Sequence, residues 1–178
     1  MLLVLDLDET LVHATETPLA IEPRCEVAPY YLYQRPGLPE FLEHVSKLFR
    51  LAVWTSSSPA YARAVCSLVF RNTESLEFVW ASDRCTPTRN FELDAWCQAK
   101  PLRKIKRRGY DLSRVVVVDD SPEKHTRNYG NLVRVAPFLG DPTDDELAHL
   151  ALYLQQLAAS PDVRRIEKRH WRRRMASD

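Results

Sequence analysis

Glycine is scarce in this chain, with four residues among 178. Loops that cradle a phosphate with backbone amides usually rely on closely spaced glycines, as in G-x-x-x-x-G-K-[ST] and G-x-G-x-x-G. The sequence contains neither pattern. A nucleotide-binding loop of either kind is therefore excluded, and any phosphate site must be built from other residues.

Long apolar stretches and paired cysteines are also missing. No stretch approaches the 18 or so apolar residues of a membrane span, and the N-terminal apolar run is too short and too acidic for a signal peptide. The four cysteines form no C-x-x-C pair, so we expect reduced thiols and no zinc site. Together these absences predict a soluble, cytoplasmic protein with no membrane partner.

The formal net charge is only +1, so the protein as a whole has no strong positive electrostatic field that would favour binding to nucleic acid. The length allows one sizeable core and is short for two. We expect a catalytic domain over residues 1–159 and a basic C-terminal tail or helix over residues 160–178. Residues 164–174 hold seven Lys or Arg. This run is either a solvated tail or a helix that contacts nucleic acid or an acidic partner.

The sequence does contain three short apolar runs, each of which stops on polar side chains. The runs cover residues 2–5, 50–54 and 115–118, and the polar residues that follow them are Asp6 and Asp8, Thr55 and Ser56, and Asp119 and Asp120. Such runs are typical of buried strands in a parallel sheet. Ligands bind at the carboxyl ends of these strands. An isolated Asp-x-Asp pair also occurs as a plain solvated strand end, but four acids at one edge would require a divalent cation such as Mg2+.

Between these runs the sequence alternates between helical and extended patterns, which predicts an α/β fold. We expect helices over Glu40–Phe49 and Ala60–Val69, the latter capped by Ser58. A third helix should follow Lys100 and end at Gly109, and a fourth should open with a capping box at Thr143–Glu146. Further expected elements are one edge strand or two short strands over Val27–Arg35, short strands over Phe78–Trp80 and Leu132–Ala136, and a turn over Pro87–Asn90.

The string Asp-Leu-Asp-Glu-Thr-Leu-Val that begins at Asp6 resembles the nucleophile motif of haloacid dehalogenase superfamily phosphatases. In detail it looks like the small C-terminal-domain phosphatases, or NLI-interacting-factor family. Three later matches follow in order: Val-Trp-Thr-Ser-Ser ending the second run, Lys100 before a helix, and Asp119-Asp120-Ser-Pro. The resemblance covers residues 2–157. It implies a Rossmann-like parallel sheet flanked by helices, with a small β-insert between residues 70 and 98 and no large cap.

The resemblance also implies a reaction, which is Mg2+-dependent hydrolysis of a phosphomonoester through an aspartyl-phosphate. The implied roles are Asp6 as nucleophile, Asp8 as general acid and base, Thr10 as the residue that orients Asp8, Thr55 and Ser56 as phosphate ligands, and Lys100 as the neutralising cation. The implied metal site uses Asp6, the backbone carbonyl of Asp8, Asp119 and Asp120. Relatives often carry Asn in place of Asp120. We expect Asp120 to be the direct ligand and Asp119 the partner of Lys100, with the reverse assignment left open.

The substrate is less tightly constrained. The resemblance favours phosphoserine or phosphothreonine in a protein or peptide, whereas an open site and a basic C-terminal segment would also admit a polynucleotide end, and a small-molecule phosphate is a further alternative. A catalytically idle module that binds phosphorylated partners is a rival from another class, although the complete set of motif residues argues against it. Four aromatic residues either line a substrate pocket or belong to the core: Phe78, Trp80, Phe91 and Trp96.

Overall fold

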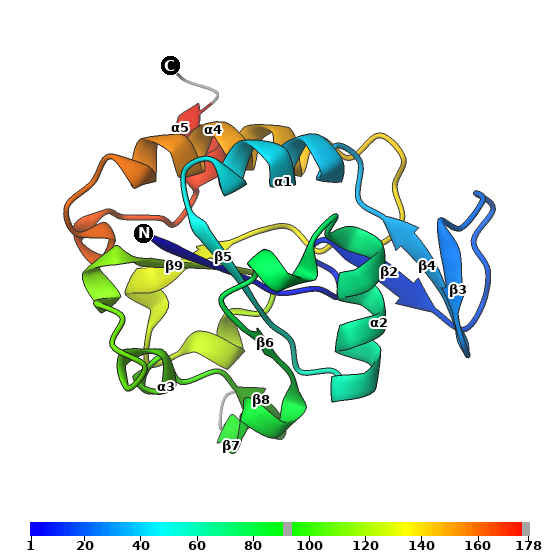
Figure 1. Cartoon of the computed structure of the whole chain (residues 1–178), viewed down its shortest axis with the longest axis horizontal. Helices are drawn as coiled ribbons and strands as arrows, with labels where there is room; N and C mark the ends of the chain where they lie inside the picture. The colour runs from blue at the N-terminus through cyan, green and yellow to red at the C-terminus, as the bar shows by residue number, and fades with distance from the viewer. Residues whose placement is uncertain (91–93, 176–178) are drawn as a thin grey trace.

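A five-stranded parallel sheet forms the centre of the computed structural model, which describes residues 1–90 and 94–175 (Figure 1). Its strand order is β10-β9-β1-β5-β6. The strands are β1 (Leu2–Leu5), β5 (Arg50–Trp54), β6 (Val79–Trp80), β9 (Val115–Asp119) and β10 (Leu132–Arg134). The expected parallel α/β architecture is therefore confirmed, and β1 lies in the middle with β5 and β9 on either side.

Both faces of the sheet are covered, as the continuous apolar runs require. Alternate residues of β1 and β9 point to opposite faces, so Leu3 and Val116 join one core cluster while Leu2 and Val115 join the other. Three helices, α1 (Leu38–Ser46), α2 (Pro59–Val69) and α4 (Glu146–Ala158), contribute to the first cluster. The short helix α3 (Arg103–Lys106) contributes to the second. In Figure 1, α1 and α4 lie side by side above the sheet.

The starts of two helices test the capping predictions. Ser58 caps α2 as expected, because its Oγ accepts a hydrogen bond from the Tyr61 amide at 3.3 Å. The capping box predicted at Thr143–Glu146 is wrong, because α4 begins only at Glu146 and Thr143 Oγ1 instead donates to Asp141 Oδ1 at 2.7 Å. Glu146 instead turns inward and accepts a hydrogen bond from the Ala136 amide at 3.0 Å. The Glu146 side chain thus has a tertiary partner, while the Glu146 amide keeps a local bond to Asp144 Oδ1 at 3.1 Å.

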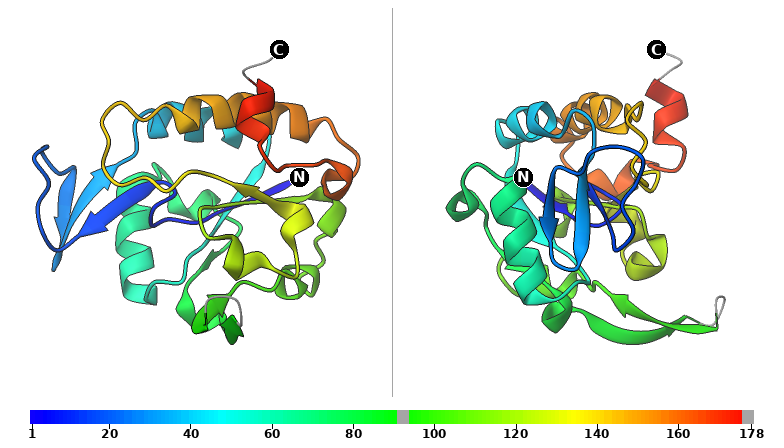
Figure 2. Two further views of the ribbon diagram at one scale, coloured as in Figure 1. Left: turned by 180° about the vertical axis from the view of Figure 1, so that it is seen from behind. Right: turned by 90° about the vertical axis from the view of Figure 1, so that its right-hand side faces the viewer.

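Two small sheets extend from the central one, and both are visible in Figure 2. The first has the order β2-β4-β3 and contains β2 (Val12–Thr15), β3 (Cys25–Val27) and β4 (Tyr30–Gln34). The expected pair of short strands on either side of Pro29 is therefore confirmed. The second is the hairpin of β7 (Thr86–Asn90) and β8 (Ala95–Ala99), which is the expected small insert. The predicted turn at Pro87–Asn90 is wrong, because these residues form β7.

The chain does not become a solvated tail after Ala159, so the expected end of the folded domain is wrong. Val163 is fully buried and Trp171, at the start of α5 (Trp171–Met175), is 3% exposed; both belong to the first core cluster. The remaining elements are short 3-10 helices at Thr73–Ser75, Ser82–Arg84, Leu112–Arg114, Pro122–His125, Tyr129–Asn131 and Val163–Arg165. Within the described ranges, no helix has both the length and the apolar character needed to cross a membrane.

Of the four aromatic residues with two alternatives, Phe78 and Trp80 are core residues that stack on each other with ring centroids 4.2 Å apart. Trp96 on β8 is instead 74% exposed. Phe91 lies outside the described residues.

Candidate active site

The three strand ends that the sequence singled out meet at one edge of the sheet. Asp6 directly follows β1, Thr55 directly follows β5, and Asp119 is the last residue of β9, with Asp120 next. Strand β1 pairs in parallel with both β5 and β9, and their registers bring Leu5 opposite Val53 and Val118. The expected convergence of the polar residues is therefore present.

Lys100 joins two of these strand ends. Its Nζ lies 2.9 Å from Asp6 Oδ1 and 2.6 Å from Asp119 Oδ2, and all three side chains are at most 2% exposed. The Lys100 amide donates to the Lys124 carbonyl at 2.9 Å, which fixes the backbone just before Pro101. Although burial disfavours the ammonium form, Asp6 and Asp119 raise the pKa of Lys100. Lys100 therefore carries a positive charge between two buried carboxylates.

Asp119 is fully engaged, whereas Asp120 is not. Asp119 Oδ2 accepts from Lys100 and lies 2.9 Å from His125 Nε2, while Asp119 Oδ1 accepts from the Ser121 amide at 2.9 Å. Burial works against the charged form, yet Lys100 and His125 hold the pKa of Asp119 below its usual range. Asp120 is only partly buried, and among the described residues its side chain accepts one hydrogen bond, from Ser121 Oγ at 3.1 Å. Asp119 is thus the partner of Lys100, whereas the carboxylate oxygens of Asp120 remain available to bind a cation.

The donor set at this edge fits a hard cation. Asp6, Asp119 and Asp120 each offer a carboxylate oxygen, and these oxygens lie within 4.8 Å of one another. Burial, reinforced by the charge of Asp119, raises the pKa of Asp6. A divalent cation bound by oxygen ligands would relieve this concentration of negative charge, and Mg2+ prefers carboxylate oxygens. Within the described residues this group does not include the Asp8 carboxylate.

Asp8 is held by hydroxyl groups on the α2 side of the site. Its Oδ2 accepts from Ser57 Oγ at 2.6 Å and from Thr55 Oγ1 at 3.4 Å, and its Oδ1 accepts from Tyr61 Oη at 2.5 Å. Burial and the charge of Asp8 raise the pKa of Tyr61, so its hydroxyl stays protonated and donates. The Asp8 carboxylate is therefore oriented by two short hydrogen bonds and one longer contact.

Asp6 and Asp8 do not share partners, although residues two apart on an extended strand would face the same way. The extended conformation ends after β1, and the backbone forms a turn in which the Leu7 carbonyl accepts from the amides of Thr10, Leu11 and Val12. This turn separates the two carboxylates. The contribution of the Asp8 backbone carbonyl to a metal site remains a prediction.

Thr10 does not orient Asp8, which corrects that expectation. Its buried Oγ1 finds no hydrogen-bond partner among the described residues. The Thr10 carbonyl instead accepts from Arg35, a fully buried residue whose guanidinium also binds Asp144 through two bonds of 2.8 Å. Ser57 and Tyr61 take the place that we expected Thr10 to hold, and Arg35 supports the turn.

The residues expected to bind phosphate lie where β5 passes into α2. Thr55 is 1% exposed, and its Oγ1 accepts from the Ser57 amide at 3.1 Å, while Ser56 between them is partly exposed. The first amides of a helix and the turn before it attract anions. The roles of Thr55 and Ser56 toward phosphate remain predictions, since no structural contact tests them.

Four side chains at the site were not anticipated from the sequence. Lys124 Nζ lies 3.6 Å from Asp6 Oδ2, and His125 contacts Asp119 as described above. Ser57 and Tyr61 contact Asp8. The only signal in the sequence for Ser57 was its position in the hydroxyl-rich turn, and Lys124 and His125 merely follow the Asp-Asp-Ser-Pro motif closely.

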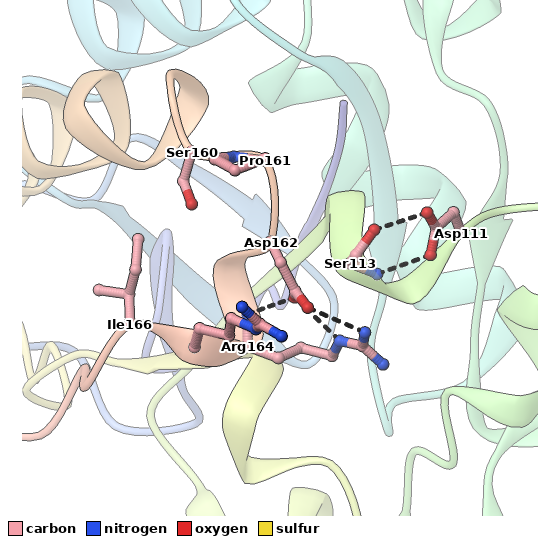
Figure 3. Close-up of a pocket in the computed structure, with 8 residues that line it drawn as sticks. Asp111, Ser113, Ser160, Pro161, Asp162, Arg164 and Ile166 are labelled. Carbon is pink, nitrogen blue, oxygen red and sulfur yellow. Dashed lines mark hydrogen bonds and ion pairs between the residues drawn. The ribbon is translucent and has the colours of Figure 1, made fainter.

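A cavity of about 620 Å³ elsewhere on the molecule does not compete with this site (Figure 3). Its polar side chains satisfy one another, with Asp111 accepting from Ser113 and Asp162 from Arg164. Ser113 belongs to the turn that leads into β9, so the cavity lies at the opposite end of that strand from Asp119. The acids and Lys100 at the carboxyl edge remain the candidate centre.

Comparison with known proteins identifies the family of the chain. Residues 1–164 match the family described as NLI interacting factor-like phosphatase. The chain belongs to this family. A human CTD small phosphatase-like protein is 30% identical over 167 residues, which cover 90% of the chain and 57% of that relative. CTD nuclear envelope phosphatase 1B of Danio rerio is 29% identical over 95% of the chain and 71% of its own length. The chain thus spans little more than half of the human relative.

The phosphatase fold is also found among solved structures. The fission yeast RNA polymerase II CTD phosphatase Fcp1 superposes with a TM-score of 0.60 at 20% identity, over 98% of this chain and 61% of that one. At this identity the likeness concerns the fold. It agrees with the expected haloacid dehalogenase-type architecture.

Family membership corrects the expected location. We expected a cytoplasmic protein because the first apolar run is short and acidic and no apolar stretch is as long as a membrane span. The Danio rerio relative, however, is named for the nuclear envelope. The expectation is therefore wrong, because these absences do not determine the compartment in which a member of this family acts.

Proposed function

We propose that the chain is a Mg2+-dependent phosphomonoester hydrolase that acts through an aspartyl-phosphate on phosphoserine or phosphothreonine in proteins. The observation that carries this proposal is the buried Asp6 at the end of the central strand, bound to Lys100 at 2.9 Å and adjacent to the carboxylates of Asp119 and Asp120. A carboxylate can be a covalent nucleophile. Phosphoryl transfer depends mainly on alignment and charge neutralisation, which this arrangement provides.

The two oxygens of Asp6 have different surroundings. Oδ1 accepts from the Leu7 amide and from Lys100, both at 2.9 Å, whereas Lys124 Nζ lies 3.6 Å from Oδ2. Asp6 Oδ2 is therefore the oxygen that bonds to phosphorus while the bond from phosphorus to the leaving oxygen breaks. Lys100 fixes the carboxylate by holding its other oxygen.

Asp8 carries the proton in both half-reactions. It gives a proton to the leaving oxygen as the aspartyl-phosphate forms. It then takes a proton from water, whose oxygen bonds to phosphorus as the bond from Asp6 Oδ2 to phosphorus breaks, and the free carboxylate returns. Ser57 and Tyr61 hold Asp8 in place, and Thr55 with the Ser56 amide receives the phosphoryl oxygens.

The residues that would hold Mg2+ are Asp6 and Asp120, with the Asp8 backbone carbonyl as a further oxygen ligand. When bound, the ion neutralises negative charge on the phosphoryl group and on the acids. Asp119 is not assigned as a ligand, because its oxygens already bind Lys100, His125 and the Ser121 amide.

The names of the relatives support a phosphoprotein substrate. Both the human and the Danio rerio relatives are called CTD phosphatases, and Fcp1 is described as an RNA polymerase II CTD phosphatase. By analogy, we assign this chain a phosphorylated serine or threonine in an accessible protein segment.

Hydrolysis of p-nitrophenyl phosphate tests the proposal. We expect the purified chain to turn over this substrate with Mg2+ and to lose turnover with EDTA. The Asp6→Asn variant should lose at least about a thousandfold in kcat, because the covalent route is closed. Asp83→Asn is the matched control, since Asp83 is an exposed surface carboxylate. Full activity of Asp6→Asn, or no activity of folded wild-type protein with Mg2+, would refute the proposal.

A further inference from the structure

A basic groove runs along the outer edge of β10. It has a volume of about 980 Å³, and Gly130, Leu132 and Arg134 form one wall. The C-terminal segment over residues 164–173 forms the other wall. This segment is fixed in place, because Lys168 Nζ donates to the Gly130 carbonyl at 2.7 Å and Trp171 Nε1 donates to the Arg134 carbonyl at 2.7 Å. The groove is thus built between the sheet edge and the C-terminal arm.

The groove is strongly positive. Seven Lys or Arg side chains line it, against two Glu, in a chain whose formal net charge is only +1. Some of these cations are paired, as Arg172 is with Glu146 at 2.5 Å. Arg134 and Arg165 are exposed and form no ion pair with any described residue, although Arg165 also lines the cavity of Figure 3, near Asp162. Their guanidinium groups are therefore available to an anionic ligand, and Arg binds phosphate through two parallel hydrogen bonds.

One end of the groove lies beside the candidate active site. In the parallel register, Arg134 on β10 is opposite Asp119 on β9, so their backbones are about 5 Å apart, the spacing of neighbouring strands. Pro122, two residues after Asp120, also lines the groove. A substrate segment bound at the active site can therefore extend directly into the groove.

We propose that this groove binds a second phosphorylated residue of the same protein segment whose first phosphoserine or phosphothreonine enters the active site. The inference rests on the proposed function and specifies its substrate, which is an extended segment that carries at least two phosphates. The groove follows an edge strand, and this shape suits an extended peptide. The first phosphate is hydrolysed, and the second is held by Arg134 or Arg165.

The aromatic side chains of the groove favour a peptide over nucleic acid. Binding of single strands usually combines basic groups with several exposed rings on which bases stack. Tyr129 is 77% exposed, but Trp171 is 3% exposed and already stacks on Tyr153 with centroids 5.2 Å apart. The groove thus offers abundant positive charge with little stacking surface, which suits phosphates on a polypeptide.

The test compares kcat/KM for synthetic peptides that carry one phosphoserine with that for peptides that carry a second phosphoserine at increasing spacing. We expect the wild type to prefer the best doubly phosphorylated peptide by about tenfold, the effect of roughly one good charged contact. The double variant Arg134→Gln/Arg165→Gln should lose this preference while keeping its rate on p-nitrophenyl phosphate. Arg71→Gln, which removes an exposed arginine outside the groove, is the matched control and should keep the preference.

Equilibrium binding separates failure of this inference from failure of the proposed function. Anisotropy of a labelled doubly phosphorylated peptide, measured with the Asp6→Asn variant, reports on the groove without turnover. Loss of binding on adding Arg134→Gln/Arg165→Gln supports the groove even if wild type hydrolyses nothing. An unchanged peptide preference in the groove variant overturns the inference even if the phosphatase is active. Tighter groove-dependent binding of a labelled single-stranded oligonucleotide than of the peptide also overturns it, in favour of nucleic acid.

Discussion

At the scale of single residues, the clearest result is how Asp8 is held. Both of its oxygens accept hydrogen bonds, from Ser57 on one side and Tyr61 on the other. Tyr61 lies in the first turn of α2, where its amide also binds the Ser58 cap. The start of one helix therefore positions the residue that must deliver a proton to the leaving group.

Tyr61→Phe tests this positioning role. The change removes one of the short bonds to Asp8 without altering the ring, so we expect about a tenfold lower kcat and a smaller change in KM. The loss should be larger for a phosphoserine peptide than for p-nitrophenyl phosphate, because an alkoxide leaving group needs the proton more than nitrophenolate does. Steady-state kinetics on both substrates measure this difference.

Tyr30→Phe is the control for that experiment. The Tyr30 ring packs edge-on against Tyr61 at 5.9 Å between centroids, but Asp8 accepts its bonds from other residues. It should keep wild-type kinetics on both substrates. Equal losses in the two variants, or an equal loss on both substrates in Tyr61→Phe, would mean that Tyr61 only supports the packing of α2.

The sequence predicted the residues of the site that follow strands, and missed those that reach it through tertiary packing. Asp6, Thr55 and Asp119 could be placed because parallel strands put their carboxyl ends on one edge. Tyr61 and His125 could not, because their roles depend on side-chain directions set by how a helix and a loop pack. Thr10 was misassigned for the same reason, since Asp8 lies only two residues before it in the motif but accepts its hydrogen bonds from Ser57 and Tyr61.

At the scale of elements, Arg35 links three segments of the chain. It directly follows β4, donates to the Thr10 carbonyl at 3.0 Å in the turn after β1, and binds Asp144 just before α4. Its side chain is fully buried. A buried charge of this kind is tolerated only when its partners are complete.

Replacing Arg35 with Met should lower the free energy of unfolding by about 3 to 5 kcal/mol, because Asp144 and the Thr10 carbonyl lose their partner. Chemical denaturation followed by circular dichroism measures the change. Arg24→Met, at an exposed arginine near the start of β3, is the control and should alter stability by less than about 0.5 kcal/mol. Similar values for the two variants would show that the Arg35 network contributes little to stability.

Elements were predictable where burial alone determines them. The valine run of β9 is buried throughout, and the sequence alone was enough to assign it as a strand. The strand β7 was mistaken for a turn because Pro87 and Asn90 favour turns, yet a two-stranded hairpin tolerates proline where a central strand does not. The capping box failed because α4 begins only at Glu146, and the Glu146 carboxylate binds the Ala136 amide and Arg172 instead of an amide at the start of the helix.

At the scale of the whole molecule, the C-terminal segment is part of the folded core as well as a source of positive charge. Its seven basic residues indicated either a solvated tail or a helix that contacts a partner, whereas its few apolar residues determine its position. Trp171 stacks on Tyr153 of α4 and donates to the carbonyl of Arg134 on β10, so one residue ties the arm to both a helix and the sheet edge. The groove proposed to receive a second phosphate exists only while this arm is docked.

Trp171→Ala should therefore reduce both stability and groove binding. Truncating a buried tryptophan costs about 3 to 5 kcal/mol, a large part of the 5 to 15 kcal/mol that stabilises a typical domain. Trp171→Phe keeps one aromatic ring but loses the bond to the Arg134 carbonyl and part of the buried indole volume, so an intermediate loss of about 1 to 3 kcal/mol is expected. Trp96→Ala removes a ring that is 74% exposed and should change little. If Trp171→Ala unfolded no more easily than Trp96→Ala in urea, the arm would not belong to the cooperative fold, and the preference for doubly phosphorylated peptides would have to arise without it.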